Sequence, residues 1–110
     1  MGQVQALNLA LCTKVQDVNA LGGLRKLNLT NGYLLTDVSA LGGVEELDLS
    51  YCRALVDVSE CARHVRKLTL RRCVRLTDVG ALGTMEQLGL SECTRLMDVS
   101  ALGTVRTLFL

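Results

Sequence analysis

Six copies of a Leu-x-Leu triplet recur at steps of 20 or 21 residues, and this regularity restricts the chain to a repeat architecture. The triplets are Leu7–Leu9, Leu27–Leu29, Leu47–Leu49, Leu68–Leu70, Leu88–Leu90 and Leu108–Leu110. Burial of about seven apolar side chains in one unit only balances the entropy of ordering about 20 residues. Stability must therefore come from contacts between neighbouring units, as in a solenoid.

The repeats align as 4–23, 24–43, 44–64, 65–84, 85–104 and a partial unit at 105–110, in one predicted domain over residues 1–110. The first half of each unit alternates apolar and polar residues, which is typical of a strand with one buried face. The second half, for example Asp37–Gly42, is long enough only for a turn or a short 3₁₀ helix. There we expect the aspartate to cap the turn and the glycine to end it at positive φ. The predicted fold is a mostly β solenoid of α/β type, right-handed, with one parallel concave sheet and convex 3₁₀ or turn arcs.

The pattern L-x-x-L-x-L-x-x-C/N resembles that of the leucine-rich repeat superfamily over essentially the whole chain. Cys73–Asp78 is similar to the cysteine-containing repeats of F-box ubiquitin-ligase receptors, whereas Asp37–Gly42 resembles the compact arcs of bacterial internalins. The mixture is similar to repeat proteins of trypanosomatids. The chain departs from the F-box receptors in lacking room for a convex α-helix. It departs from internalins in its cysteines and its lack of proline.

Composition and charge limit the range of functions. The 110 residues carry a formal net charge of +1, so we expect no strong attraction to nucleic acid or to an anionic membrane. The sequence has no long apolar run and no signal-peptide pattern, which favours a cytoplasmic or otherwise intracellular protein. Because the chain opens on one predicted strand and ends inside another, we expect a fragment of a longer array. Exposed terminal repeats would then favour self-association.

Four cysteines occupy one repeat position, at Cys12, Cys52, Cys73 and Cys93, and Gly32 replaces them in the second unit. Equivalent positions in stacked strands lie about 4.8 Å apart in a straight column, so these residues cannot converge tetrahedrally on zinc. We therefore expect reduced, buried thiols. Cys61 stands at a leucine position near the only histidine, His64, and is interpreted as a core substitution in the single 21-residue unit.

One aspartate per unit, as at Asp17 and Asp37, is better explained by repeated capping than by calcium binding, because no Gly-Gly-x-Gly-x-Asp signature is present. We expect no cofactor and no metal. A single histidine and no glycine-rich phosphate loop leave no set of groups from which to build a catalytic centre, so the chain is predicted not to be an enzyme.

The polar positions of the strands carry the functional prediction. Pairs such as Arg25/Lys26 and Glu45/Glu46 alternate in sign between repeats, which predicts a cross-strand charge ladder. The two residues that follow each Leu-x-Leu triplet form a second set of equivalent positions, which predicts a partner-binding cluster at the middle of the sheet. The residues at the strand centres are expected to contribute less to binding. The predicted partner-binding residues are Tyr51, Arg71, Arg72 and Glu92, with Asn28, Asp48 and Thr69 at the centres.

The predicted function is a protein–protein interaction module that binds a partner protein on the concave sheet face. One alternative is a structural element that assembles through its uncapped ends. The other, which the cysteine-type repeat implies by resemblance, is the substrate-recognition arm of a ubiquitin ligase.

Overall fold

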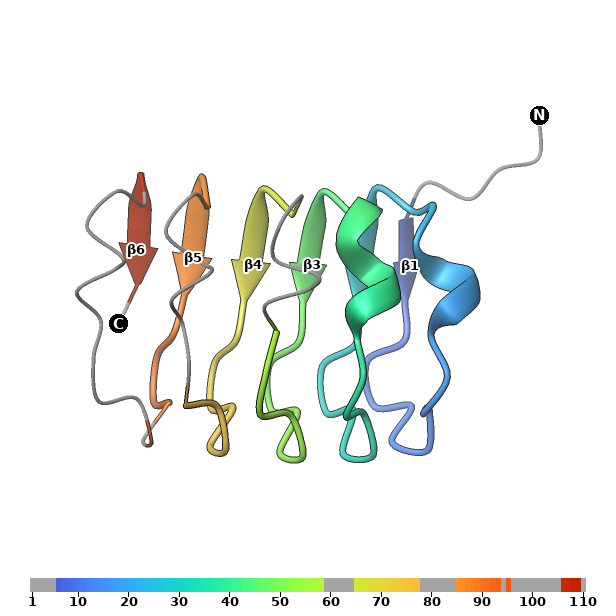
Figure 1. Ribbon diagram of the computed structural model, residues 1–110, viewed down its shortest axis with the longest axis horizontal. Coiled ribbons are helices and arrows are strands. Elements are labelled where there is room, and N and C mark those ends of the chain that lie inside the picture. Colours follow the sequence, from blue (N-terminus) through green and yellow to red (C-terminus); the bar gives the residue numbers. More distant parts are fainter. Residues whose placement is uncertain (1–5, 59–64, 78–84, 94, 96–105, 110) are drawn as a thin grey trace.

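A computed structural model describes residues 6–58, 65–77, 85–93, 95 and 106–109 of the chain. The described residues form a solenoid with one six-stranded sheet, in which strands follow one another in sequence order (Figure 1). Two 3₁₀ helices lie in the arcs that connect the first three strands. The elements are β1 (Ala6–Asn8), η1 (Asn19–Leu21), β2 (Lys26–Asn28), η2 (Ser39–Gly43), β3 (Glu46–Asp48), β4 (Lys67–Thr69), β5 (Gln87–Gly89) and β6 (Thr107–Phe109). The predicted mostly β solenoid with one parallel sheet is confirmed.

The strands pair in parallel and in the register that the leucine triplets predict. Leu7 lies opposite Leu27, which lies opposite Leu47, and the series continues to β6. The third repeat has one residue more than the others, yet β3 and β4 keep this register. Val58 and Val65 are both buried and align with equivalent residues of the preceding repeat, so the extra residue falls between them.

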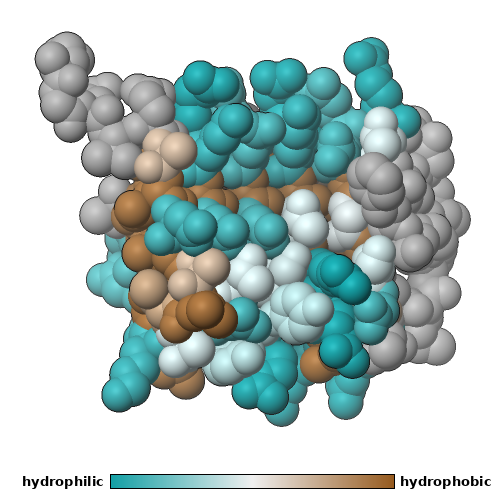
Figure 2. Space-filling model, turned by 180° about the vertical axis from the view of Figure 1, so that it is seen from behind, coloured by the Kyte–Doolittle hydropathy of each residue, from teal (hydrophilic) through white to brown (hydrophobic). Residues whose placement is uncertain are grey.

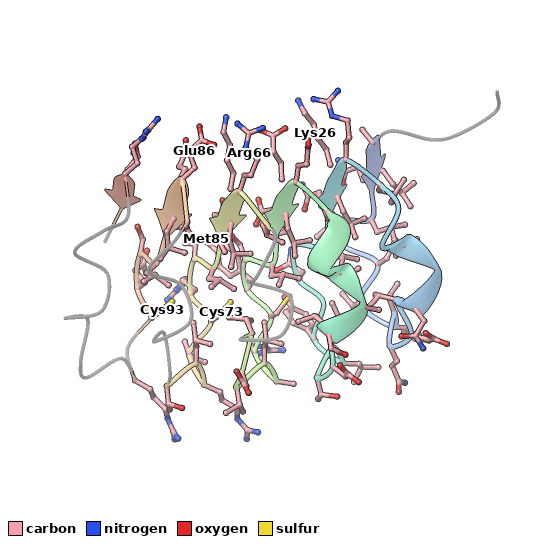
Figure 3. The ribbon with its side chains drawn as sticks, turned by 45° about the horizontal axis from the view of Figure 1, so that its top comes forward. Lys26, Arg66, Cys73, Met85, Glu86 and Cys93 are labelled. Carbon is pink, nitrogen blue, oxygen red and sulfur yellow. The ribbon has the colours of Figure 1, made fainter. Side chains whose placement is uncertain are left out.

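The core is a stack of aliphatic side chains between the sheet and the arcs. Leu47 and Leu49 alternate with polar residues along β3, and both are at most 2% exposed. From the opposite side, the arc residues Val38 and Leu41 close over them and are equally buried. Figure 3 shows Met85, Cys73 and Cys93 pointing into this interior, whereas Lys26, Arg66 and Glu86 point away from it. Period-two alternation therefore divides the strand residues between the core and the exposed face.

In each of the first two arcs, the aspartate lies one residue before the N-cap position of the 3₁₀ helix, and its carboxylate accepts a backbone hydrogen bond from there. The residue that precedes each 3₁₀ helix is Val18 or Val38 rather than the aspartate. Asp37 Oδ1 accepts the backbone N–H of Ser39 at 3.0 Å, and Asp17 does the same for Asn19. The predicted acceptor role is confirmed for these two aspartates. Asp78 and Asp98, with Cys61 and His64, lie outside the described residues.

The predicted positive φ of the arc glycines is wrong, because none of the described glycines lies in the left-handed region. Their role is close approach between arcs. A Cβ on Gly22 would collide with the carbonyl oxygen of Ala40, and a Cβ on Gly43 would lie 2.7 Å from the carbonyl oxygen of Gly22. Glycine therefore lets successive arcs stack at the spacing of the strands.

Left-handed backbone occurs instead at one repeat position without glycine. The residue two places after the Leu-x-Leu triplet has φ between 56° and 69° in five consecutive repeats. It lies in a turn closed by a bond to the triplet, as when Cys52 N–H donates to the Leu49 carbonyl at 3.3 Å. A turn of this kind needs a positive φ at its third residue, which normally favours glycine or asparagine. The five residues are Leu11, Asn31, Tyr51, Arg72 and Glu92.

Candidate protein-binding face of the sheet

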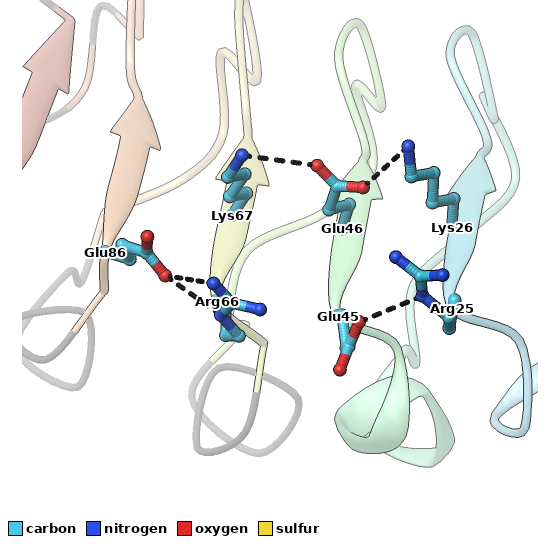
Figure 4. Close-up of polar contacts among 7 residues, drawn as sticks. All are labelled: Arg25, Lys26, Glu45, Glu46, Arg66, Lys67 and Glu86. Carbon is cyan, nitrogen blue, oxygen red and sulfur yellow. Dashed lines mark hydrogen bonds and ion pairs between the residues drawn. The ribbon is translucent and has the colours of Figure 1, made fainter.

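The strands begin with a ladder of opposite charges on the exposed face (Figure 4). Glu46 lies between Lys26 at 3.1 Å and Lys67 at 3.5 Å, and the two lysines hold the pKa of its carboxyl below the usual value. Arg25 pairs with Glu45 at 3.2 Å, and Arg66 pairs with Glu86 at 2.8 Å. The predicted ladder is confirmed. These exposed pairs add little stability but discourage slippage of the strand register.

At the strand ends, the Asn or Asp side chain turns back onto the backbone. Asn28 Oδ1 accepts the N–H of Thr30 at 2.9 Å and also its hydroxyl at 2.6 Å. Asp48 Oδ1 accepts the N–H of Ser50 at 2.9 Å. Both predicted binding residues thus have a local structural role that occupies one side-chain oxygen. Thr69, the third predicted strand-centre residue, lies beside them in register and is half-buried.

The four residues predicted as the main contact cluster lie together. Glu92 accepts from Arg72 Nε at 3.0 Å and from Arg71 Nη2 at 3.5 Å, so two guanidinium groups share one carboxylate. The guanidinium carbon of Arg72 lies 5.9 Å from the centre of the Tyr51 ring. Tyr51, Arg72 and Glu92 are all left-handed residues, and this conformation places them where the chain leaves the sheet. The cluster is therefore compact and has more positive than negative charge.

Three further residues, which the sequence prediction missed, join this cluster. Tyr33, Arg53 and Val74 line a shallow pocket of about 290 Å³ together with Tyr51 and Arg72. The guanidinium carbon of Arg53 lies 4.1 Å above the centre of the Tyr33 ring. These three residues share one repeat position, directly after the Cys or Gly column. Reading that column across the repeats would have found them.

The cysteine column is an internal hydrogen-bond ladder rather than a reactive site. Cys73 Sγ donates to the Leu49 carbonyl at 3.1 Å, and Cys52 and Cys93 make the same contact to the preceding repeat. Burial raises the pKa of Cys52 to about 11 and that of Cys73 to about 12. Such thiols stay protonated and are poor nucleophiles. The prediction of buried thiols is confirmed for Cys52 and Cys73, but Cys12, in the first repeat, is exposed.

The face opposite the arcs is hydrophilic over the strand starts and more apolar toward the first repeat (Figure 2). Among the residues that the structure describes, the large apolar side chains exposed anywhere on the surface are Leu11, Tyr33, Leu34 and Val56, and Leu11 is 74% exposed. Within the described ranges, no group of three His, Cys, Asp or Glu side chains is placed to hold a metal ion. The same part of the chain contains no helix long and apolar enough to cross a membrane.

Comparison with protein families, with curated proteins and with solved structures finds no match to this chain.

Proposed function

We propose that this chain is a leucine-rich repeat module that binds a partner protein on the exposed face of its sheet. The leucine-rich repeat assignment is supported by the in-register Leu-x-Leu strands. It is also supported by a polar ladder three residues after the triplet in the third, fourth and fifth repeats, where the thiol replaces the usual asparagine side chain as donor to the backbone.

The observation that carries the binding proposal is the cluster of Tyr51, Arg71, Arg72 and Glu92. A left-handed conformation costs a residue with a Cβ about 1–2 kcal/mol, and a sequence selected only for stability would favour glycine at such positions. Here Tyr51, Arg72 and Glu92 occupy them. Tyrosine and arginine are also the residue types that dominate the energy of protein interfaces. Large side chains at strained, outward positions favour recognition over stability.

Site-specific photocrosslinking tests this proposal. A benzophenone amino acid replaces Ser91, which follows β5 at the same repeat position as Arg71 and is half-buried. The matched control replaces Ser39, which is exposed on the arc side in η2. In a lysate of the source cells, the Ser91 probe should capture one defined protein that the Ser39 probe does not. Equal capture from both faces, or none from Ser91, would contradict the proposal.

A second candidate function, assembly through the ends of the solenoid, is favoured by the exposure of the first repeat. Leu7 and Leu9 are only partly buried, whereas their equivalents Leu27 and Leu29 are at most 3% exposed. We infer that this end is adhesive. Light scattering across a concentration series should then show an oligomer that Leu11→Lys weakens. Leu34→Lys, an exposed change in the second repeat, is the control. A monodisperse monomer at all concentrations would rule this function out.

A further inference from the structure

We infer that the pocket lined by Tyr33, Tyr51, Arg53, Arg72 and Val74 recognises a glutamate or aspartate side chain within an extended segment of a partner protein. This inference rests on the proposed protein-binding function and specifies the chemistry of the partner. The pocket lies beyond the carboxyl ends of β2, β3 and β4, beside the Arg71–Glu92 ion pair.

Charge is the first argument for an acidic ligand. The guanidinium of Arg53 lies against the Tyr33 ring, and among the described residues no carboxylate pairs with it. Arg72 shares the single carboxylate of Glu92 with Arg71. The pocket therefore presents N–H donors in excess of its acceptors. A carboxylate bound between two arginines would accept charge-assisted hydrogen bonds, which are about twice as strong as neutral ones.

Rigidity is the second argument. The Tyr33 hydroxyl donates to Asn31 Oδ1 at 3.2 Å, which fixes the ring on which Arg53 lies. Arg72 is anchored by Glu92 at 3.0 Å and approaches the Tyr51 ring. The guanidinium group of Arg53 is therefore placed over the Tyr33 ring, and that of Arg72 is placed by Glu92, before a ligand arrives. Such preorganisation lowers the entropy lost on binding.

Size and shape indicate a peptide side chain rather than a cofactor. The pocket volume of about 290 Å³ lies at the lower limit of small-molecule sites, which span about 300–1,000 Å³. Its lining comes from three successive repeats, and strands stand about 4.8 Å apart, so the pocket extends over about 10 Å. An extended peptide covers that length with about three residues. Val74 and the two rings provide apolar contact on either side of a central acidic residue.

The test is an NMR titration of the full chain with N-acetyl-Leu-Glu-Leu-amide, observed at the arginine side-chain Nε–H signals. We expect saturable shifts at Arg53 and Arg72 and none with the matched Leu-Gln-Leu peptide. Arg53→Gln should weaken binding about tenfold, which corresponds to one lost charge-assisted contact. Arg25→Gln removes the same charge at the start of β2, away from the pocket, and should leave the affinity unchanged.

Three results would overturn the inference: equal shifts with both peptides, equal weakening by Arg53→Gln and Arg25→Gln, or much tighter binding of a Leu-phosphoserine-Leu peptide. The last would indicate a phosphate site instead. Because Arg53 is exposed, Arg53→Gln should leave the backbone amide spectrum otherwise unchanged. Failure here is distinguishable from failure of the proposed function, since capture of a protein by the Ser91 probe does not require an acidic ligand in this pocket.

Discussion

The thiol of Cys73 donates to the carbonyl oxygen of Leu49 across 3.1 Å, and this contact joins two successive repeats behind the sheet. The same carbonyl also accepts the backbone N–H of Cys52 at 3.3 Å. In the third, fourth and fifth repeats, one cysteine thus provides a polar contact to the preceding repeat without leaving a strong donor unpaired. The contact makes specific predictions about stability.

Cys73→Ala should destabilise the chain by about 1–2 kcal/mol, because it removes a buried sulfur and leaves the Leu49 carbonyl without its second donor. Cys12→Ala is the control. Cys12 is exposed, so that change should stay within about 0.5 kcal/mol. Urea unfolding of both variants provides the measurement. Equal effects would show that the thiol contact contributes nothing.

The same thiols predict a loss of stability at alkaline pH. Free thiols ionise near pH 8.5 in an unfolded chain, whereas burial raises the pKa of Cys52 to about 11 and that of Cys73 to about 12. The unfolded state therefore releases these protons first. Stability is full below the unfolded pKa and falls as pH rises through the folded values. The urea midpoint should fall less between about pH 8 and about pH 10 in a Cys52→Ala/Cys73→Ala variant than in the unmodified chain. An unchanged pH dependence would contradict this assignment.

Gly43→Ala should destabilise the stack of arcs. The new Cβ would lie 2.7 Å from the Gly22 carbonyl oxygen, and relieving that contact requires a shift of backbone that costs about 1–3 kcal/mol. Gly23→Ala is the matched control, because its Cβ would meet nothing within 4 Å. It should be neutral or stabilise by up to about 1 kcal/mol. Thermal unfolding would separate the two, and an equal melting temperature would remove close approach as the reason for glycine.

At the repeat position where φ is positive, substitution by glycine should increase the stability of the chain. Leu11 has φ 69° and is 74% exposed, so Leu11→Gly should relieve strain with little loss of packing and stabilise the chain by about 1 kcal/mol. Leu34→Gly, at an exposed leucine without positive φ, should destabilise by about 0.5–1 kcal/mol. Chemical denaturation checks both signs. A destabilising Leu11→Gly would mean that the turn carries no strain.

The strands, their register and the charge ladder could be predicted because each depends on one residue type that recurs at one spacing. Alternation fixes which side of a strand is buried, and the period fixes which residues become neighbours, as for Lys26 and Glu46. The glycines were harder to interpret, since glycine serves both positive φ and close approach, and only the packing of arcs distinguishes them at Gly22 and Gly43. The local sequence pattern does not show whether a glycine is needed for a positive φ or for close approach of two arcs.

The pocket could not be predicted in full because it depends on turn geometry. Tyr51 and Arg72 have a left-handed conformation, although no glycine or proline in the sequence indicates a turn there. The direction of the chain after this turn places Arg53 over the Tyr33 ring. Strand columns predicted Tyr51, Arg71, Arg72 and Glu92 correctly as neighbours. They gave no information about the residues that follow the cysteines, because there the chain has already turned away from the strand direction.

The most direct test of the binding account is the yield of the Ser91 photocrosslink in two charge-matched variants. Arg71→Ala/Arg72→Ala removes the two guanidinium groups of the cluster, and Arg25→Ala/Arg66→Ala removes two at the strand starts. Truncation of interface anchors at about 1–2 kcal/mol each predicts at least a tenfold lower yield for the first variant. The second should retain the yield of the unmodified chain. Equal yields from both variants would contradict binding through the cluster of Tyr51, Arg71, Arg72 and Glu92.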